Sequence, residues 1–123
     1  MASIADYILD AALSKLDLEA NAIFLTSAEA TTYAEATSAL ALGNSTALSI
    51  AAPADRAEGG REVDVAEITD GDITGSGTVT HYAIVDTVNT RLLVTGVLSV
   101  SQVVTAGNTF SLATFSIGIP DPV

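Results

Sequence analysis

The chain has 123 residues, of which fifteen are acidic and four are basic, so its formal net charge is −11 at neutral pH. Hydrophobic residues make up 49% of the sequence and charged residues only 15%, which excludes an intrinsically disordered chain and indicates a single globular domain. The few basic residues are scattered, which argues against nucleic acid or an anionic membrane surface as a partner. The absence of Cys excludes disulfides and thiolate metal sites.

The first predicted element is an amphipathic helix over residues 3–18. Ser3 is the expected N-cap, and Asp6 follows in the first turn, where a carboxylate interacts favourably with the helix dipole. A stripe of leucines recurs at helical spacing and consists of Leu9, Leu13 and Leu16. Such a helix packs either on the chain's own sheet or on a neighbouring subunit.

Short strands and turns are predicted next. Strands are expected at Ala22–Ser27 and Thr46–Ile50, and the segment between them is expected to be a loop that ends in a weak strand or helical turn near Ala39–Leu42. Gly43-Asn44 is a turn signal. Residues 53–60, which contain Pro and two Gly, are predicted to form an exposed loop.

Residues 61–69 alternate more regularly. Val63 and Val65 point one way and the two acidic residues beside them point the other way, which is typical of an antiparallel strand with one face in solvent. Asp70-Gly71-Asp72 predicts a turn, and Gly75-Ser76-Gly77 predicts a second bend or a bulge.

The segment from Gly75 to Pro120 is the most strand-like part of the chain. Only His81, Asp86 and Arg91 interrupt its run of apolar and neutral polar residues. Thr78–Asp86 is apolar on both faces and is predicted to be a central strand. The expected connections are a hairpin loop at 87–90, a strand at 91–100, a turn at 105–108, and a last strand through residues 110–117 that ends before the prolines.

These elements predict a mainly β protein, an antiparallel β-sandwich of jelly-roll or immunoglobulin-like type with one N-terminal α-helix. We expect residues 1–20 to form an N-terminal helix or arm and residues 21–123 to form a single β-sandwich domain.

Few side chains in this sequence suggest catalysis. His81 lies within a predicted strand and is interpreted as a core or interface residue, and Ser76 lies in TGSGT, which is not a nucleophile elbow. The carboxylates available for glycoside hydrolysis lack the aromatic platforms that usually accompany them; they are Glu29, Glu35, Glu58, Glu62 and Glu67. We predict no catalytic or cofactor-binding residue, no cofactor and no enzyme activity.

One stretch has the spacing of a cation site. Asp70, Asp72, Thr74 and Gly75 match the first half of a calcium loop, because alternate oxygen ligands can converge on one hard cation. The twelfth position is His81 rather than the bidentate Glu, which favours a plain acidic turn. We therefore predict no metal-binding residue.

The later predicted strands contain a set of residues whose spacing is typical of one group of proteins. It consists of Thr78–His81, Asp86, Leu92-Leu93, Gly96, Leu98-Ser99 and Ala106–Phe110. In these residues a strand TVTH-x-A is followed by LL-x-x-G-x-L-S and by an apolar strand after a G-N-T-F turn. The pattern resembles the C-terminal half of small virion proteins of tailed bacteriophages, which are described as head decoration, head-fibre or tail-fibre proteins. The resemblance implies a structural protein of the virion.

The composition narrows this expectation. The chain has no heptads or repeats for a long fibre shaft, and its acidity suits the outside of a shell, away from packaged DNA. We expect a capsid decoration (cement) protein that is made in the host cytoplasm, binds the outside of the head and stabilises it. Its expected partners are the major capsid protein and copies of itself in a homo-oligomer such as a trimer, with no nucleic acid and no membrane. The alternative is a tail- or head-fibre adhesin module that binds the host surface.

Overall fold

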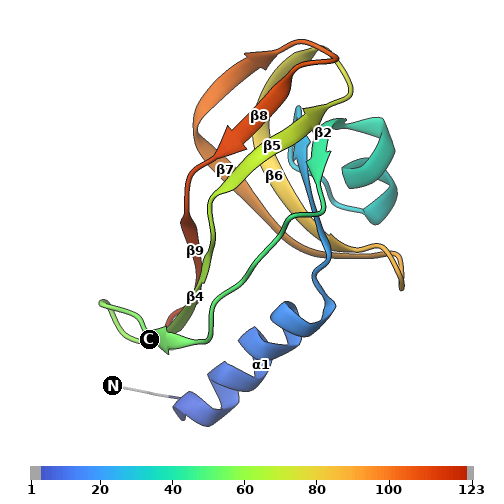
Figure 1. The fold of residues 1–123 in the computed structure, drawn as a ribbon. Coiled ribbons are helices and arrows are strands. Elements are labelled where there is room, and N and C mark those ends of the chain that lie inside the picture. Colours follow the sequence, from blue (N-terminus) through green and yellow to red (C-terminus); the bar gives the residue numbers. More distant parts are fainter. Residues whose placement is uncertain (1–3, 122–123) are drawn as a thin grey trace. The chain divides into compact units, whose positions relative to one another are not determined.

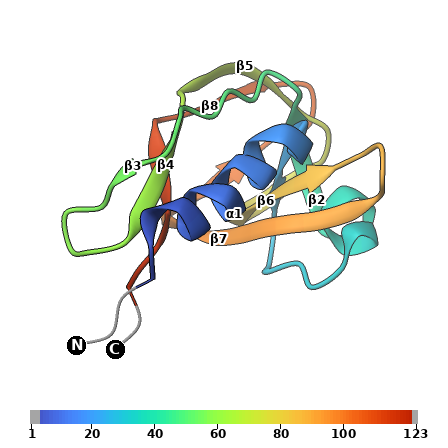
Figure 2. The same cartoon turned by 90° about the horizontal axis from the view of Figure 1, so that it is seen from below.

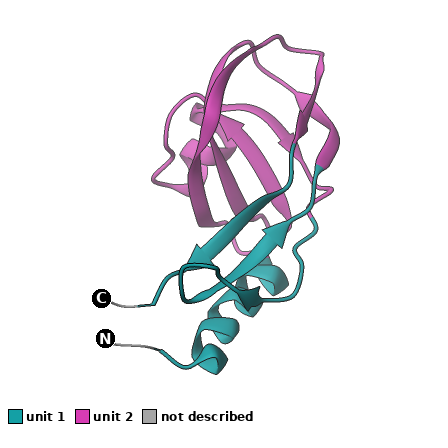
Figure 3. Ribbon diagram, turned by 90° about the vertical axis from the view of Figure 1, so that its left-hand side faces the viewer, with its two compact units in different colours: residues 1–19, 49–67, 113–123 teal, residues 20–48, 68–112 magenta. Residues whose placement is uncertain are grey.

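The computed structural model describes residues 4–121, which form antiparallel strands and one N-terminal α-helix (Figure 1). This confirms the predicted mainly β, β-sandwich-like class with a helix at its start. The chain divides into two compact units (Figure 3): the described parts of residues 1–19, 49–67 and 113–123, and residues 20–48 with 68–112. Compact units are not separately folding domains, so the expected division at residue 20 stays a prediction.

The first unit combines the helix with a three-stranded sheet. Its elements are α1 (Asp6–Glu19), β3 (Ala54–Asp55), β4 (Arg61–Val65) and β9 (Phe115–Ile119), and the sheet has the order β3-β4-β9. Val63 and Val65 are buried while Asp64 is exposed, so the predicted alternation is confirmed. Leu9 and Leu13, one helical turn apart, are buried, and α1 contacts β4 (Figure 2). The predicted N-cap, Ser3, lies outside the described residues.

The second unit is a six-stranded antiparallel sheet. Its strands are β1 (Ala22–Thr26), β2 (Ala41–Ser45), β5 (Ile68–Ile73), β6 (Gly77–Asp86), β7 (Arg91–Val104) and β8 (Thr109–Leu112). The order is β7-β6-β1-β2-β5-β8, so β6 is an interior strand and the two edge strands are neighbours in sequence. The sheet curls between these edges (Figure 1), and the turn at residues 105–108 joins them. The predicted turns at 87–90 and 105–108 are confirmed, and β7 extends four residues beyond its expected end.

Small side chains fill one face of this sheet. Ala22 lies opposite Val85, and Phe24 lies opposite Ala83, in the β1–β6 pair. The buried Ala22, Ala83 and Val85 form one cluster with Ala30 and Ala36 of the chain between β1 and β2. The partly buried residues packed against it are Phe24, Tyr33, Leu40 and Leu92. A core of this kind has little volume per residue, as the scarcity of aromatic residues predicts.

Two predicted turns are wrong, because both sequences lie within paired strands. Gly43-Asn44 belongs to β2, and Asp70-Gly71-Asp72 belongs to β5. The glycines are needed for close approach: a Cβ at Gly71 would overlap the Phe110 ring, and a Cβ at Gly43 would lie 2.8 Å from the carbonyl oxygen of Asp72. In this sheet, glycines that resemble a turn signal therefore lie where an aromatic ring or a neighbouring strand packs closely against the backbone.

Three further expectations need correction. Residues 46–50 are not a strand: the Ser45 hydroxyl accepts a hydrogen bond from the Ala47 amide (3.1 Å), and only Ile50 forms an isolated bridge, with Val65. The predicted loop after β1 contains a π-helix, Glu35–Ala39, before β2. The expected last strand is two strands, because β8 ends at Leu112 and β9 begins at Phe115 in the other sheet.

Candidate binding surface

His81 has a structural position in β6. The Thr80 hydroxyl donates to the carbonyl oxygen of Ser27 (2.9 Å) and lies 2.8 Å from His81 Nδ1. A hydroxyl carries one proton, so while it donates to Ser27 its oxygen can accept from the imidazole only in the tautomer that carries the proton on Nδ1. The pair of side chains thereby fastens β6 to the segment that leaves β1. His81 is half-buried beside β1, opposite Thr26.

Ser76, Asp70 and Asp72, the serine and aspartates considered in the sequence, have structural or exposed positions. Ser76 Oγ accepts a hydrogen bond from the Ala106 amide (3.0 Å) and so supports the β7–β8 turn. Asp70 and Asp72 are exposed on β5, and Asp70 has a positive φ of 57° at the irregularity that places Gly71 opposite Phe110. Within residues 4–121, no group of three or more His, Asp or Glu side chains gathers as a metal site.

Glu35 is the one candidate glutamate with a defined set of hydrogen bonds. Its carboxylate accepts bonds from the Thr31 amide and from the Thr31 hydroxyl, both at 2.8 Å. These bonds lower the pKa of the exposed Glu35 carboxyl, since they favour its charged form. Glu35 therefore closes the loop before the π-helix. The other candidates lie in different parts of the chain: Glu29 precedes this loop, whereas Glu58, Glu62 and Glu67 belong to the first unit.

Asp86 is buried at the end of β6, a role that the sequence analysis did not assign. It accepts hydrogen bonds from the side chain of Asn89 (2.8 Å) and from the amides of Val88 (3.0 Å) and Asn89 (3.2 Å). The Asn89 side chain contributes most to a lowered pKa of the Asp86 carboxyl, followed by these amides and by the charge of Arg91. The sequence signal for this turn is an Asp at the end of a strand, followed three residues later by an Asn.

Arg61 is a second unassigned structural residue. Its guanidinium binds Asp10 of α1 through two bonds, Nε–Oδ1 at 2.7 Å and Nη2–Oδ2 at 3.1 Å, and binds Asp55 through Nη1 at 2.7 Å. The bonds to Asp10 and then to Asp55 raise the pKa of Arg61. This bidentate arrangement ties α1 to β4 within the first unit. Because Asp10 is 51 positions from Arg61 in sequence, no local sequence pattern predicts this ion pair.

The last surface feature is a long uncharged stretch of the chain that includes two edge strands. From Leu92 to Pro120 the chain has no charged or titratable side chain, and all fifteen acidic residues lie outside this stretch. Both edge strands of the six-stranded sheet, β7 and β8, belong to it. On β7, three valines are more than two-thirds exposed: Val97 (71%), Val100 (72%) and Val103 (76%). Valines left in water on an edge strand are typical of a contact surface.

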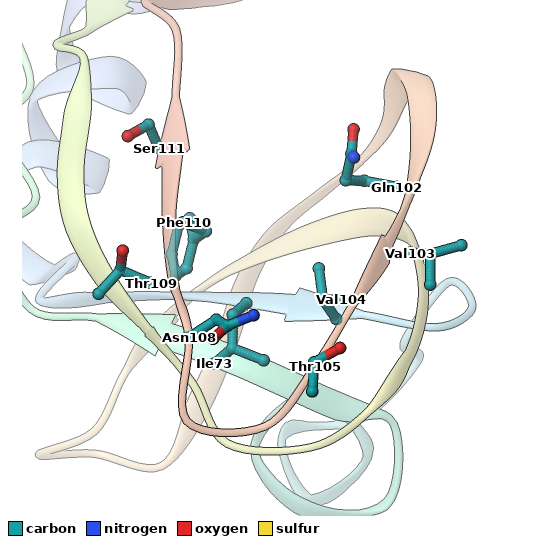
Figure 4. Close-up of a pocket in the computed structure, with 9 residues that line it drawn as sticks. All are labelled: Ile73, Gln102, Val103, Val104, Thr105, Asn108, Thr109, Phe110 and Ser111. Atoms are coloured by element: carbon teal, nitrogen blue, oxygen red, sulfur yellow. The ribbon is translucent and has the colours of Figure 1, made fainter.

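A pocket of about 320 Å³ lies between the ends of the two edge strands. Its lining comes from both arms of the β7–β8 turn, with Ile73 of β5 beside them (Figure 4). The apolar residues Val103, Val104 and Phe110 are joined there by neutral polar side chains, which are Gln102, Thr105, Asn108, Thr109 and Ser111. The pocket therefore offers hydroxyl and amide groups without a charge.

Comparisons with protein-family models, with curated proteins and with solved structures found no match. Among the described helices, none is both long enough and apolar enough to cross a bilayer.

Proposed function

We propose that this chain is a structural protein of a bacteriophage virion, a capsid decoration protein that binds the major capsid protein from outside and stabilises the head. The observation that carries the proposal is the recurrent sequence pattern of Thr78–Phe110 together with its place in the fold. Its residues lie on β6, β7, the β7–β8 turn and the start of β8. A pattern spread over consecutive strands suits a structural framework rather than a catalytic site.

The hydrogen bonds of the polar side chains support a structural role. His81, Ser76, Glu35 and Asp86 each bind a neighbouring main-chain or side-chain group that holds a loop or turn. A nucleophile or general base instead needs an open position beside a partner. The proposal accordingly assigns the chain no enzyme activity and no cofactor.

The exposed side of α1 is the proposed contact with the shell. Tyr7, Ile8 and Leu18 are exposed by 82%, 56% and 82%, and acidic side chains lie between them. A surface that mixes apolar and acidic groups fits a partner surface that is apolar with basic groups around it. Virion attachment from outside also keeps a chain of net charge −11 away from packaged DNA.

A cryo-EM map of the virions tests the location. We expect density for this chain at regular positions over the outer surface of the head, in contact with major capsid subunits. Density confined to the tail or its tip, or absence of the chain from purified particles, contradicts the proposal.

One observation favours a second function, an adhesin module on a tail or head fibre. The pocket at the β7–β8 turn presents the neutral amide and hydroxyl groups of Gln102, Asn108 and Thr105, which can bind an uncharged polar ligand such as a surface glycan. This alternative predicts a specific signal on a glycan array that Asn108→Ala abolishes. The decoration role predicts no such signal.

A further inference from the structure

The middle of β7 departs from regular pairing with β6. Val79 of β6 lies opposite Gln102, whereas His81, two residues later, lies opposite Val97. The four residues between Val97 and Gln102 on β7 therefore face Thr80 alone. Such a bulge leaves extra residues outside the ladder of hydrogen bonds and bends the strand, and bulges of this kind are built features rather than defects.

The bulge carries the exposed valines. Val100 lies within it, and Val97 and Val103 flank it, so three valines with about three-quarters of their surface in water occur within seven residues of an edge strand. The residues between them on β7 are Ser, Gln and Leu, and His81 of β6 lies opposite Val97. We define the exposed β7 patch as residues 97–103.

Charge distinguishes this patch from the other exposed apolar side chains. On α1, the exposed Leu18 lies beside the exposed Asp17, so two copies of the helix that met there would bring carboxylates together. The β7 patch contains no charged residue, and the nearest one in sequence is Arg91, six positions before Val97 at the start of β7. In a chain of net charge −11, it is a surface on which two identical copies can meet with little repulsion.

We infer that the exposed β7 patch is the contact between two copies of this chain, related by a twofold axis. A twofold contact places the same residues of both copies against each other, so Val100 of one copy lies within the patch of the other. The apolar area of the valines supplies the attraction, and the lack of charge makes the patch self-complementary. This inference does not depend on the decoration role.

Analytical ultracentrifugation of the full chain tests it over micromolar to millimolar concentrations. We expect a reversible dimer of the wild type. Val100→Glu raises the dissociation constant at least about tenfold, because the substitution occurs twice in the contact and places two carboxylates together. High salt restores part of the affinity, since the Debye length falls to about 3 Å at 1 M.

Two variants complete the test. Val88→Glu is the matched control: Val88 is 81% exposed in the β6–β7 turn, and the change adds the same charge outside the patch, so the dimer is retained. Val100→Ser removes apolar area without adding charge and weakens the dimer at all salt concentrations. Circular dichroism checks that each variant keeps the fold, as expected at side chains this exposed.

Three results overturn the inference. One is a wild-type chain that stays monomeric over the whole range. Another is a dimer that Val100→Glu and Val88→Glu weaken equally. The third is a monomeric chain whose binding to purified heads, rather than to itself, is lost on Val100→Glu, since the patch would then serve a different partner.

Discussion

Two threonines of the six-stranded sheet differ in what their hydroxyl groups contact. Thr26 is fully buried on β1 and its Oγ1 has no hydrogen-bond partner in the described chain, whereas the Thr80 hydroxyl binds both Ser27 and His81. Valine keeps the branched shape of threonine, so each Thr→Val change isolates the hydroxyl. We expect Thr26→Val to raise the free energy of unfolding by about 1 kcal/mol and Thr80→Val to lower it by about 1 kcal/mol. Urea unfolding of the two variants measures both, and changes of the same sign contradict the assignment.

Asp86 makes stability depend on pH. Its pKa is lowered in the folded chain, so its hydrogen bonds stabilise the fold above the unfolded pKa of about 3.9 and this contribution is lost as pH falls through the lower folded value. We expect the melting temperature to fall on acidification below about pH 4, and Asp86→Asn to flatten that part of the profile. The pKa of Glu35 is also lowered, so this residue still contributes to the loss of stability at low pH in the variant. An unchanged acid limb in Asp86→Asn contradicts this role.

The Arg61 guanidinium ties the helix α1 to β4, in addition to the buried Leu9 and Leu13. Arg61→Met removes the bidentate bond to Asp10 and leaves that carboxylate unpaired, and Arg61→Lys keeps the charge without the fork geometry. We expect faster amide hydrogen exchange along Asp6–Glu19 in both variants, with the larger effect in Arg61→Met. Arg56→Met is the control, because Arg56 binds Gly59 and Glu58 without contacting the helix. Equal exchange in Arg61→Met and Arg56→Met contradicts the account.

Elements defined by local alternation could be predicted, and elements defined by distant packing could not. The predicted strands at β1, β4 and β6 are confirmed because apolar residues, β-branched ones among them, alternate or run together there. Gly43 and Gly71 gave a turn signal but lie in strands. Glycine is needed there because the Phe110 ring packs against Gly71 and the backbone of a neighbouring strand packs against Gly43. The break between β8 and β9 has no Gly or Pro to mark it.

The same distinction holds for the side chains. The uncharged character of the later strands is visible in the sequence, whereas the exposure of Val97, Val100 and Val103 depends on which strand forms the sheet edge and on a bulge. The pairing of Arg61 with Asp10 spans most of the first half of the chain, beyond the reach of any periodicity. His81 was expected to be a core or interface residue, and its bond to Thr80 gives it a structural position.

The molecule as a whole has few aromatic side chains with which to build a core. It contains no Trp and only three Phe and three Tyr, and much of the cluster beside β1 and β6 is alanine. Because small side chains bury little area, we expect contacts with neighbouring copies to add to the stability of the fold. A repeated structural protein meets this requirement, since each copy is stabilised by those around it. The acidic residues outside the later strands are compatible with the exposed position that the proposed decoration role requires.

The number of copies per particle distinguishes the proposed role most directly. Stained-gel or quantitative mass-spectrometric comparison of this chain with the major capsid protein, in purified virions, gives that number. Attachment over the whole shell predicts a copy number comparable to that of the major capsid protein, in the hundreds rather than a handful. A handful of copies per particle, or none, contradicts the decoration role.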